Sequence, residues 1–178
     1  SRQDARRLAE VSDNWEALVD AYDDAIQEAA LSDDRQRADL LVEQGYLLEE
    51  RLEDLEQACR VYGEALIECE GHAEAIDALE RILLRIDDAE ALAAFYRERA
   101  QEENDVEEAK GWLEKLARRA EITEFDPEGA IEAYYDILDY DPEDAHAATA
   151  LQRLLSYQGR WYDLTDLLRD RREVIDEV

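Results

Sequence analysis

Apolar residues recur along most of the chain at spacings of three and four, the period of an α-helix buried on one face. Ala58, Tyr62, Ala65 and Leu66, for example, fall on one such face. Turn and capping residues interrupt the pattern and set the ends of the expected elements. The pattern predicts helices at residues 2–11, 14–29, 34–51, 54–69, 72–86, 88–103, 105–122, 127–140, 143–158 and 160–177.

Residues typical of helix ends lie between these segments. Pro127 fits a first helical turn, and Gly71 and Gly159 lie where the chain must leave a helix. The connections are short, so successive helices are expected to pack antiparallel. Side chains that can accept a hydrogen bond at a helix start are Asp13, Asp33, Asp87, Asp126 and the pair Glu143 and Asp144.

The pattern also repeats over a longer distance. Residues 54–99 match residues 126–171 at 14 of 46 positions when the two are compared at a shift of 72 residues. Such a period indicates one structural unit stacked on copies of itself. Because the small residues Ala58 and Ala130 precede Tyr62 and Tyr134 by one turn, we expect these rings to be buried over them. The recurring positions are Tyr22, Tyr62, Tyr96 and Tyr134, followed by Leu168.

One stretch carries a family resemblance. Residues 127–142, PEGAIEAYYDILDYDP, resemble the second helix and closing turn of the tetratricopeptide repeat (TPR), with Ala130, Tyr134 and Pro142 in the small, aromatic and proline positions. The resemblance implies an all-α, right-handed α-α solenoid of about five helix pairs, similar to degenerate TPR arrays of long bacterial proteins. It covers residues 1–178 as a single domain, with units at about 1–30, 34–69, 72–103, 105–140 and 143–177.

The chain departs from the TPR pattern in several places, among them the first helices of the pairs. The family's glycine in the first helix is matched only by Gly45, whereas Ala117 and Gln152 stand in two of the other units.

The resemblance also implies a binding face. In TPR proteins the first helix of each pair lines a concave groove that holds a peptide or another helix. Because the arginine fork binds carboxylates in a bidentate manner, a row of arginines there favours a carboxylate-rich partner. In the alternative interpretation, each arginine pairs with a glutamate of the neighbouring helix. The implied groove residues are Tyr46, Arg81, Arg118 and Arg153, with Arg85 and Arg119 beside them and Arg7 as a match in the first unit.

Charge narrows the range of partners. The chain has 49 acidic and 20 basic residues, a net charge of -29, which repels nucleic-acid phosphates and anionic membranes. The expected partner is therefore a protein or peptide. Arginine greatly outnumbers lysine, and adaptation to high salt and an arginine-biased genome both remain open as explanations of this composition.

Carboxylates at helical spacing are frequent enough to arise by chance. Glu49 with Glu53 could form an acid–base pair, but a solvated helix face with arginine partners is the simpler interpretation. His146 with Asp141 and Asp144 offers metal donors, although acids at a helix N-terminus explain the same residues. No catalytic residue, metal or cofactor is expected.

The sequence thus predicts a non-catalytic protein-interaction scaffold. The alternatives are a structural spacer or self-assembly element of a larger protein, and a hydrolase that uses paired carboxylates. No apolar stretch approaches the ~18 residues of a membrane span. The chain starts with Ser1 and contains no methionine, so we expect a fragment of a longer protein. The sequence leaves the compartment open, with the cytoplasm favoured.

Cysteines and aromatic residues complete the expectations. Cys59 and Cys69 lie roughly 15 Å apart on one predicted helix, too far for a disulfide bond, and are expected to be free thiols. Trp15 and Trp161 occupy equivalent helix starts and are predicted to pack in the core. Exposed tyrosines that could anchor a partner are Tyr140, Tyr157 and Tyr162.

Overall fold

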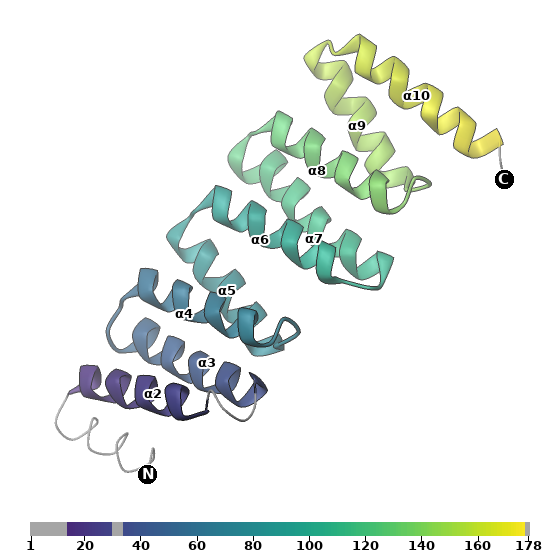
Figure 1. Cartoon of the computed structure of the whole chain (residues 1–178). Coiled ribbons are helices and arrows are strands. Elements are labelled where there is room, and N and C mark those ends of the chain that lie inside the picture. Colours follow the sequence, from purple (N-terminus) through teal and green to yellow (C-terminus); the bar gives the residue numbers. More distant parts are fainter. Residues whose placement is uncertain (1–13, 30–33, 177–178) are drawn as a thin grey trace. The chain divides into compact units, whose positions relative to one another are not determined.

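The computed structural model describes residues 14–29 and 34–176 (Figure 1). Within these ranges there are nine α-helices, one π-helical turn and no β-strand. The helices are α2 (Trp15–Ala29), α3 (Asp34–Glu50), α4 (Leu55–Glu68), α5 (Ala73–Ile86), α6 (Ala89–Glu102), α7 (Val106–Arg119), α8 (Pro127–Tyr140), α9 (Ala145–Gln158) and α10 (Trp161–Asp176), and the π turn η1 is Ala120–Glu124.

The predicted helix boundaries agree with these within two residues, with one exception. The helix expected at 105–122 ends as an α-helix at Arg119 and continues as the wider π turn η1. The helix predicted at 2–11, the caps Asp13 and Asp33, and Arg7 lie outside the described residues.

The chain divides into two compact units, Ser1–Leu92 and Ala93–Val178, and the boundary falls inside α6. The single repeat domain expected from the sequence stays a prediction.

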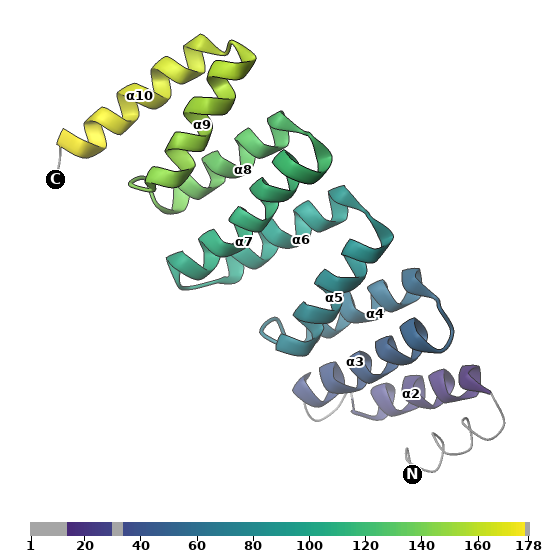
Figure 2. The ribbon, with the colours of Figure 1, turned by 180° about the vertical axis from the view of Figure 1, so that it is seen from behind.

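In unit 1, α4 packs against both α3 and α5, α3 also contacts α5, and α2 packs on α3. The helices α3, α4 and α5 run in alternating directions (Figures 1 and 2). Tyr22 and Tyr62 are buried in this core, as predicted, and the fully buried Ala58 lies one turn before Tyr62.

In unit 2, α8 packs against α7, α9 and η1, and α9 packs against α10. Tyr134 is buried over Ala130, and Tyr96 stacks on Trp112 with ring centroids 6.1 Å apart. Leu168, which follows the tyrosines at the repeat spacing, is exposed, and its neighbour Leu167 is buried instead. Within the described residues no helix follows α10 to cover the face that carries Leu168.

The two units stop and restart their helices at corresponding residues. Asp54 and Asp126 are both N-caps whose carboxylates accept the backbone N–H three residues later. Before them, Glu53 and Phe125 both have a left-handed backbone, with φ of 54° and 53°. The repeat therefore includes the turns between helices as well as the buried face.

One predicted cap is corrected. Asp87 was expected to start the helix at 88–103, but it ends α5 in the left-handed conformation with φ of 56°, as Gly159 ends α9 with φ of 70°. The neighbouring Asp88 caps α6 by accepting the backbone N–H of Ala91 at 2.9 Å. Aspartate tolerates the left-handed region better than most residues, so Asp87 can end α5 as readily as it could have capped the start of α6.

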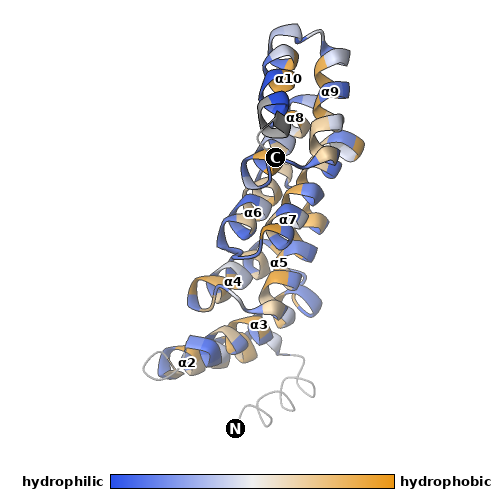
Figure 3. Ribbon diagram, turned by 90° about the vertical axis from the view of Figure 1, so that its right-hand side faces the viewer, coloured by the Kyte–Doolittle hydropathy of each residue, from blue (hydrophilic) through white to orange (hydrophobic). Residues whose placement is uncertain are grey.

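Each helix carries both hydrophobic and hydrophilic residues, as the spacing of three and four in the sequence requires (Figure 3). The predicted all-α class with antiparallel helix pairs is confirmed within each unit. None of the helices in the described part of the chain is long and apolar enough to cross a membrane.

Candidate partner-binding site

A buried carboxylate holds the first-helix face of unit 1 together. Only 1% of the Glu49 side chain on α3 is exposed. Its oxygens accept hydrogen bonds from the Tyr62 hydroxyl of α4 at 3.1 Å and from Arg81 and Arg85 of α5 at 2.6 and 2.5 Å. One carboxylate therefore ties three helices to each other.

The two arginines determine whether the Glu49 carboxyl is ionised. Burial opposes the charged form of Glu49, but the hydrogen bonds and charges of Arg81 and Arg85 outweigh it and lower its pKa. Burial and the neighbouring Glu49 raise the pKa of Tyr62 in turn. Glu49 is thus ionised and fully engaged at neutral pH, which is the opposite of what a general acid requires.

Gly45 allows Tyr62 to reach this position. A Cβ atom built on Gly45 would lie 2.3 Å from the Tyr62 ring, so only glycine leaves room for the ring against α3. The Tyr46 ring then packs edge-on against Tyr62, with centroids 5.8 Å apart, and Arg81 lies over Tyr46 at 5.4 Å. The space beside the tyrosine is filled by Tyr46 in unit 1.

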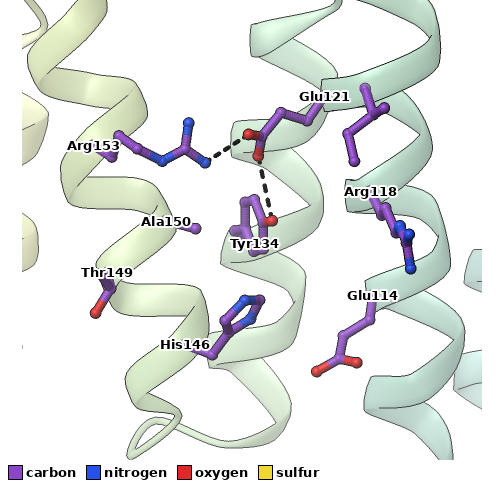
Figure 4. Close-up of a pocket in the computed structure, with 9 residues that line it drawn as sticks. Glu114, Arg118, Glu121, Tyr134, His146, Thr149, Ala150 and Arg153 are labelled. Atoms are coloured by element: carbon purple, nitrogen blue, oxygen red, sulfur yellow. Dashed lines mark hydrogen bonds and ion pairs between the residues drawn. The ribbon is translucent and has the colours of Figure 1, made fainter.

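Unit 2 contains the same constellation 72 residues later. Glu121 of η1 accepts a hydrogen bond from the Tyr134 hydroxyl of α8 at 3.4 Å and pairs with Arg153 of α9 at 2.7 Å (Figure 4). The Glu121 side chain is 26% exposed, and the longer tyrosine contact is weaker than its counterpart in unit 1. The carboxylate is therefore held more loosely and is open to solvent.

Two residue changes account for this difference. Ala117 stands at the position of Gly45, so its Cβ excludes a ring placed as Tyr62 is placed in unit 1. Arg118 stands at the position of Tyr46 and brings no ring to cover Tyr134. Tyr134 instead lies edge-on to His146, with centroids 6.1 Å apart.

A hollow of about 510 Å³ opens at this place between α7 and α9, floored by Tyr134 (Figure 4). The exposed Ile122 gives it an apolar wall, and Arg118 and Arg153 give it two guanidinium groups. The hollow is lined by Glu114, Arg118, Glu121, Ile122, Tyr134, His146, Thr149, Ala150 and Arg153.

The structure separates the predicted groove residues into two groups. Arg81 and Arg85 are committed to Glu49, and Arg153 to Glu121, as the helix-pairing interpretation expected. Arg118 is exposed and makes no ion pair with any described residue. Among the remaining predicted residues, Tyr46 is part of the unit 1 cluster, and Arg119 is half-buried and has partners of its own.

Two of the three donors considered for a metal, the carboxylates of Asp141 and Asp144, pair with a lysine. The ammonium group of the buried Lys110 lies 2.7 Å from a carboxylate oxygen of Asp141 and 2.7 Å from one of Asp144. These hydrogen bonds raise the pKa of Lys110. No cluster of three or more potential ligands occurs in the described residues.

The interpretation of Glu49 as part of a solvated helix face is wrong, because α5 covers it with two arginines. The signal was present in the sequence. The comparison of residues 54–99 with 126–171 stops short of Glu49 and Glu121, which also match at the 72-residue shift. Glutamate, tyrosine and arginine therefore recur together at one spacing, and the structure brings them into contact in both units.

The remaining aromatic and cysteine predictions give a mixed result. Trp161 is 62% exposed, so its placement in the core is wrong, and Tyr140 is half-buried and donates its hydroxyl hydrogen to the Ala100 carbonyl at 3.1 Å. Tyr157 and Tyr162 are exposed as expected. Cys59 and Cys69 are free thiols, as predicted.

Comparison with solved structures finds several structures of MamA. Two crystal structures of MamA each share 15% identity with this chain. One aligns over 95% of this chain and 93% of its own with a TM-score of 0.44, and the other over 97% and 88% with 0.47. A structure titled MamA RS-1 ArsTM double mutant shares 16% identity over 99% and 93%, with a TM-score of 0.45.

Sequence comparisons give no assignment. No protein-family model matches the chain, and no curated protein matches it.

Proposed function

We propose that the chain is a TPR-like, non-catalytic scaffold that binds a peptide, tail or helix of another protein on the face made by the first helices of its pairs. The hollow between α7 and α9 is the observation that carries this proposal. It combines an apolar wall, Ile122, with Arg118, a cation that no described carboxylate pairs with. A ligand that supplies an aliphatic side chain and a carboxylate would satisfy both.

The net negative charge of the protein makes Arg118, which pairs with no described carboxylate, selective for a carboxylate ligand. In a chain of net charge -29, most cations are neutralised by neighbours, as Arg81, Arg85 and Arg153 are. Arg153 can also contribute, because its partner Glu121 is partly solvated and can share the guanidinium with an incoming carboxylate. Arg81 and Arg85 serve the stack instead, since moving them would strand the buried Glu49.

A displayed library of 12-residue peptides tests this function. Peptides selected on the wild-type chain should contain a carboxylate next to an aliphatic residue. After synthesis, their affinity should fall at least tenfold in the R118Q/R153Q double variant, as the loss of charge-assisted hydrogen bonds requires. Arg169 is a matched control, because it is an exposed arginine of the same unit that pairs within α10.

The R169Q variant should keep wild-type affinity. Selected peptides that bind R118Q/R153Q as tightly as the wild type would contradict the proposed site.

A further inference from the structure

The corner where α9 turns into α10 carries three exposed aromatic rings. Tyr157 is 89% exposed, Trp161 62% and Tyr162 90%. They fall within six consecutive residues, around the left-handed Gly159 that ends α9 (Figure 1). Clustered exposed aromatic side chains mark interaction sites more often than isolated ones do.

The repeat itself does not require these rings. The corresponding corner of unit 1, between α5 and α6, makes the same left-handed turn at Asp87. In place of Tyr157, Trp161 and Tyr162 it has Arg85, Ala89 and Glu90. The turn therefore forms without any aromatic residue, and the rings of unit 2 need another explanation.

The other tryptophans show what this protein places on an indole face. Arg51 lies over Trp15 at 4.8 Å, and Lys115 lies over Trp112 at 4.0 Å. In the described part of the chain no cation lies over Trp161. The adjacent Arg160 is taken up by Glu128 and Asp163, both at 2.6 Å.

The surroundings of the corner are acidic. Asp163, Asp166 and Asp170 act together, after burial, to raise the pKa of the neighbouring Tyr135. Arg160 pairs with Asp163, and Arg169 pairs with Asp166. Aromatic faces close to carboxylates in a chain of net charge -29 attract the guanidinium and ammonium groups of a partner and repel its acids.

We propose that the α9–α10 corner binds a basic segment of a partner protein, which places an arginine or lysine side chain on the face of Trp161 between Tyr157 and Tyr162. This site is separate from the hollow beside Arg118 and takes ligands of the opposite charge. A second copy of the chain fits it poorly, because two chains of net charge -29 repel each other.

Binding of an acetylated and amidated tetra-arginine peptide, followed by NMR of the indole N–H groups, tests the proposal. The chain has three tryptophans, so each indole resonance reports one site. The resonance of Trp161 should shift most, because Trp15 and Trp112 already carry cations. A tetra-citrulline peptide, which keeps the shape of arginine without its charge, should leave all three resonances unchanged.

The triple variant Y157A/W161A/Y162A separates aromatic recognition from general attraction between opposite charges, because it leaves the net charge unchanged. The Kd for tetra-arginine should rise about tenfold in this variant, as expected from three exposed cation–π contacts. The control is F125A, which removes another exposed ring of unit 2, 82% exposed, and should bind as the wild type does. All three rings are exposed, so circular dichroism should show an unchanged helix content.

An unchanged Kd in the triple variant would overturn the proposal, because the attraction would then be purely electrostatic. A molecular mass that doubles with concentration in the wild type and stays monomeric in the triple variant would also overturn it, by assigning the corner to a second copy. Binding of the selected carboxylate-containing peptides to R118Q/R153Q tests only the proposed scaffold function, because that variant leaves the three rings of this corner in place.

Discussion

The two units contain the same glutamate, tyrosine and arginine and use them differently. In unit 1, Gly45 admits the Tyr62 ring, Tyr46 covers it, and Glu49 is sealed under two arginines. In unit 2, Ala117 and Arg118 replace Gly45 and Tyr46, and a hollow opens over Tyr134. Unit 1 therefore buries its carboxylate, whereas unit 2 leaves the corresponding carboxylate partly exposed beside a hollow.

Removing the central rings should have the largest effect. Truncating Tyr62 to alanine should lower the free energy of unfolding by about 4 kcal/mol, because a fully buried ring is lost and Glu49 loses a donor. Tyr134 to alanine should cost about 3 kcal/mol, since its ring already borders a hollow. Urea unfolding followed by circular dichroism measures both, and losses below 1 kcal/mol at both sites would remove these rings from the core.

The arginines should distinguish the joint from the open surface. The R81A/R85A double variant leaves the buried Glu49 charge without cations and should cost about 2–3 kcal/mol. The R153A variant should cost less than about 1 kcal/mol, because Glu121 can be solvated. Equal losses in the two variants, measured in the same unfolding series, would erase the distinction between the units.

Gly45 of unit 1 and Ala117 of unit 2 can each be replaced by the residue that stands at the corresponding position of the other unit. The G45A variant should lose about 2 kcal/mol, because its Cβ would overlap the fully buried Tyr62 ring at 2.3 Å. At Ala117 the reverse change, A117G, should cost about 1 kcal/mol from helix propensity. A G45A variant as stable as the wild type would show that the close approach of Tyr62 to α3 is not required.

Acid should weaken the joint at Glu49. The pKa of Glu49 is lowered in the folded chain from its ordinary 4.5, so its contribution is complete above that value and is lost as the pH falls through the folded pKa. The stability difference between wild type and E49Q should therefore shrink below about pH 4.5. It is measured by urea unfolding between pH 7 and pH 3, and a constant difference over this range would contradict the ionised, paired state of Glu49.

The periodic pattern and the repeat were sufficient to predict the helices and the buried rings. Local chemistry fixed these features: apolar spacing set the buried faces, and Asp54, Asp126 and Gly159 set the ends. The site was predicted only in part. The TPR resemblance implied Arg118 and Arg153 as groove residues, whereas Glu49 resembled any other acidic residue of a helix surface.

Tertiary structure decided which carboxylate was buried and which place stayed open. A glutamate is sealed only when arginines from a neighbouring helix reach it, and that depends on how closely α3, α4 and α5 approach. The approach is set by the absence of one Cβ atom at Gly45, whose effect depends on where the Tyr62 ring lies in three dimensions. The sequence by itself determined the repeated helices, and the close approach that a missing methyl group permits at Gly45 decided which carboxylate is buried.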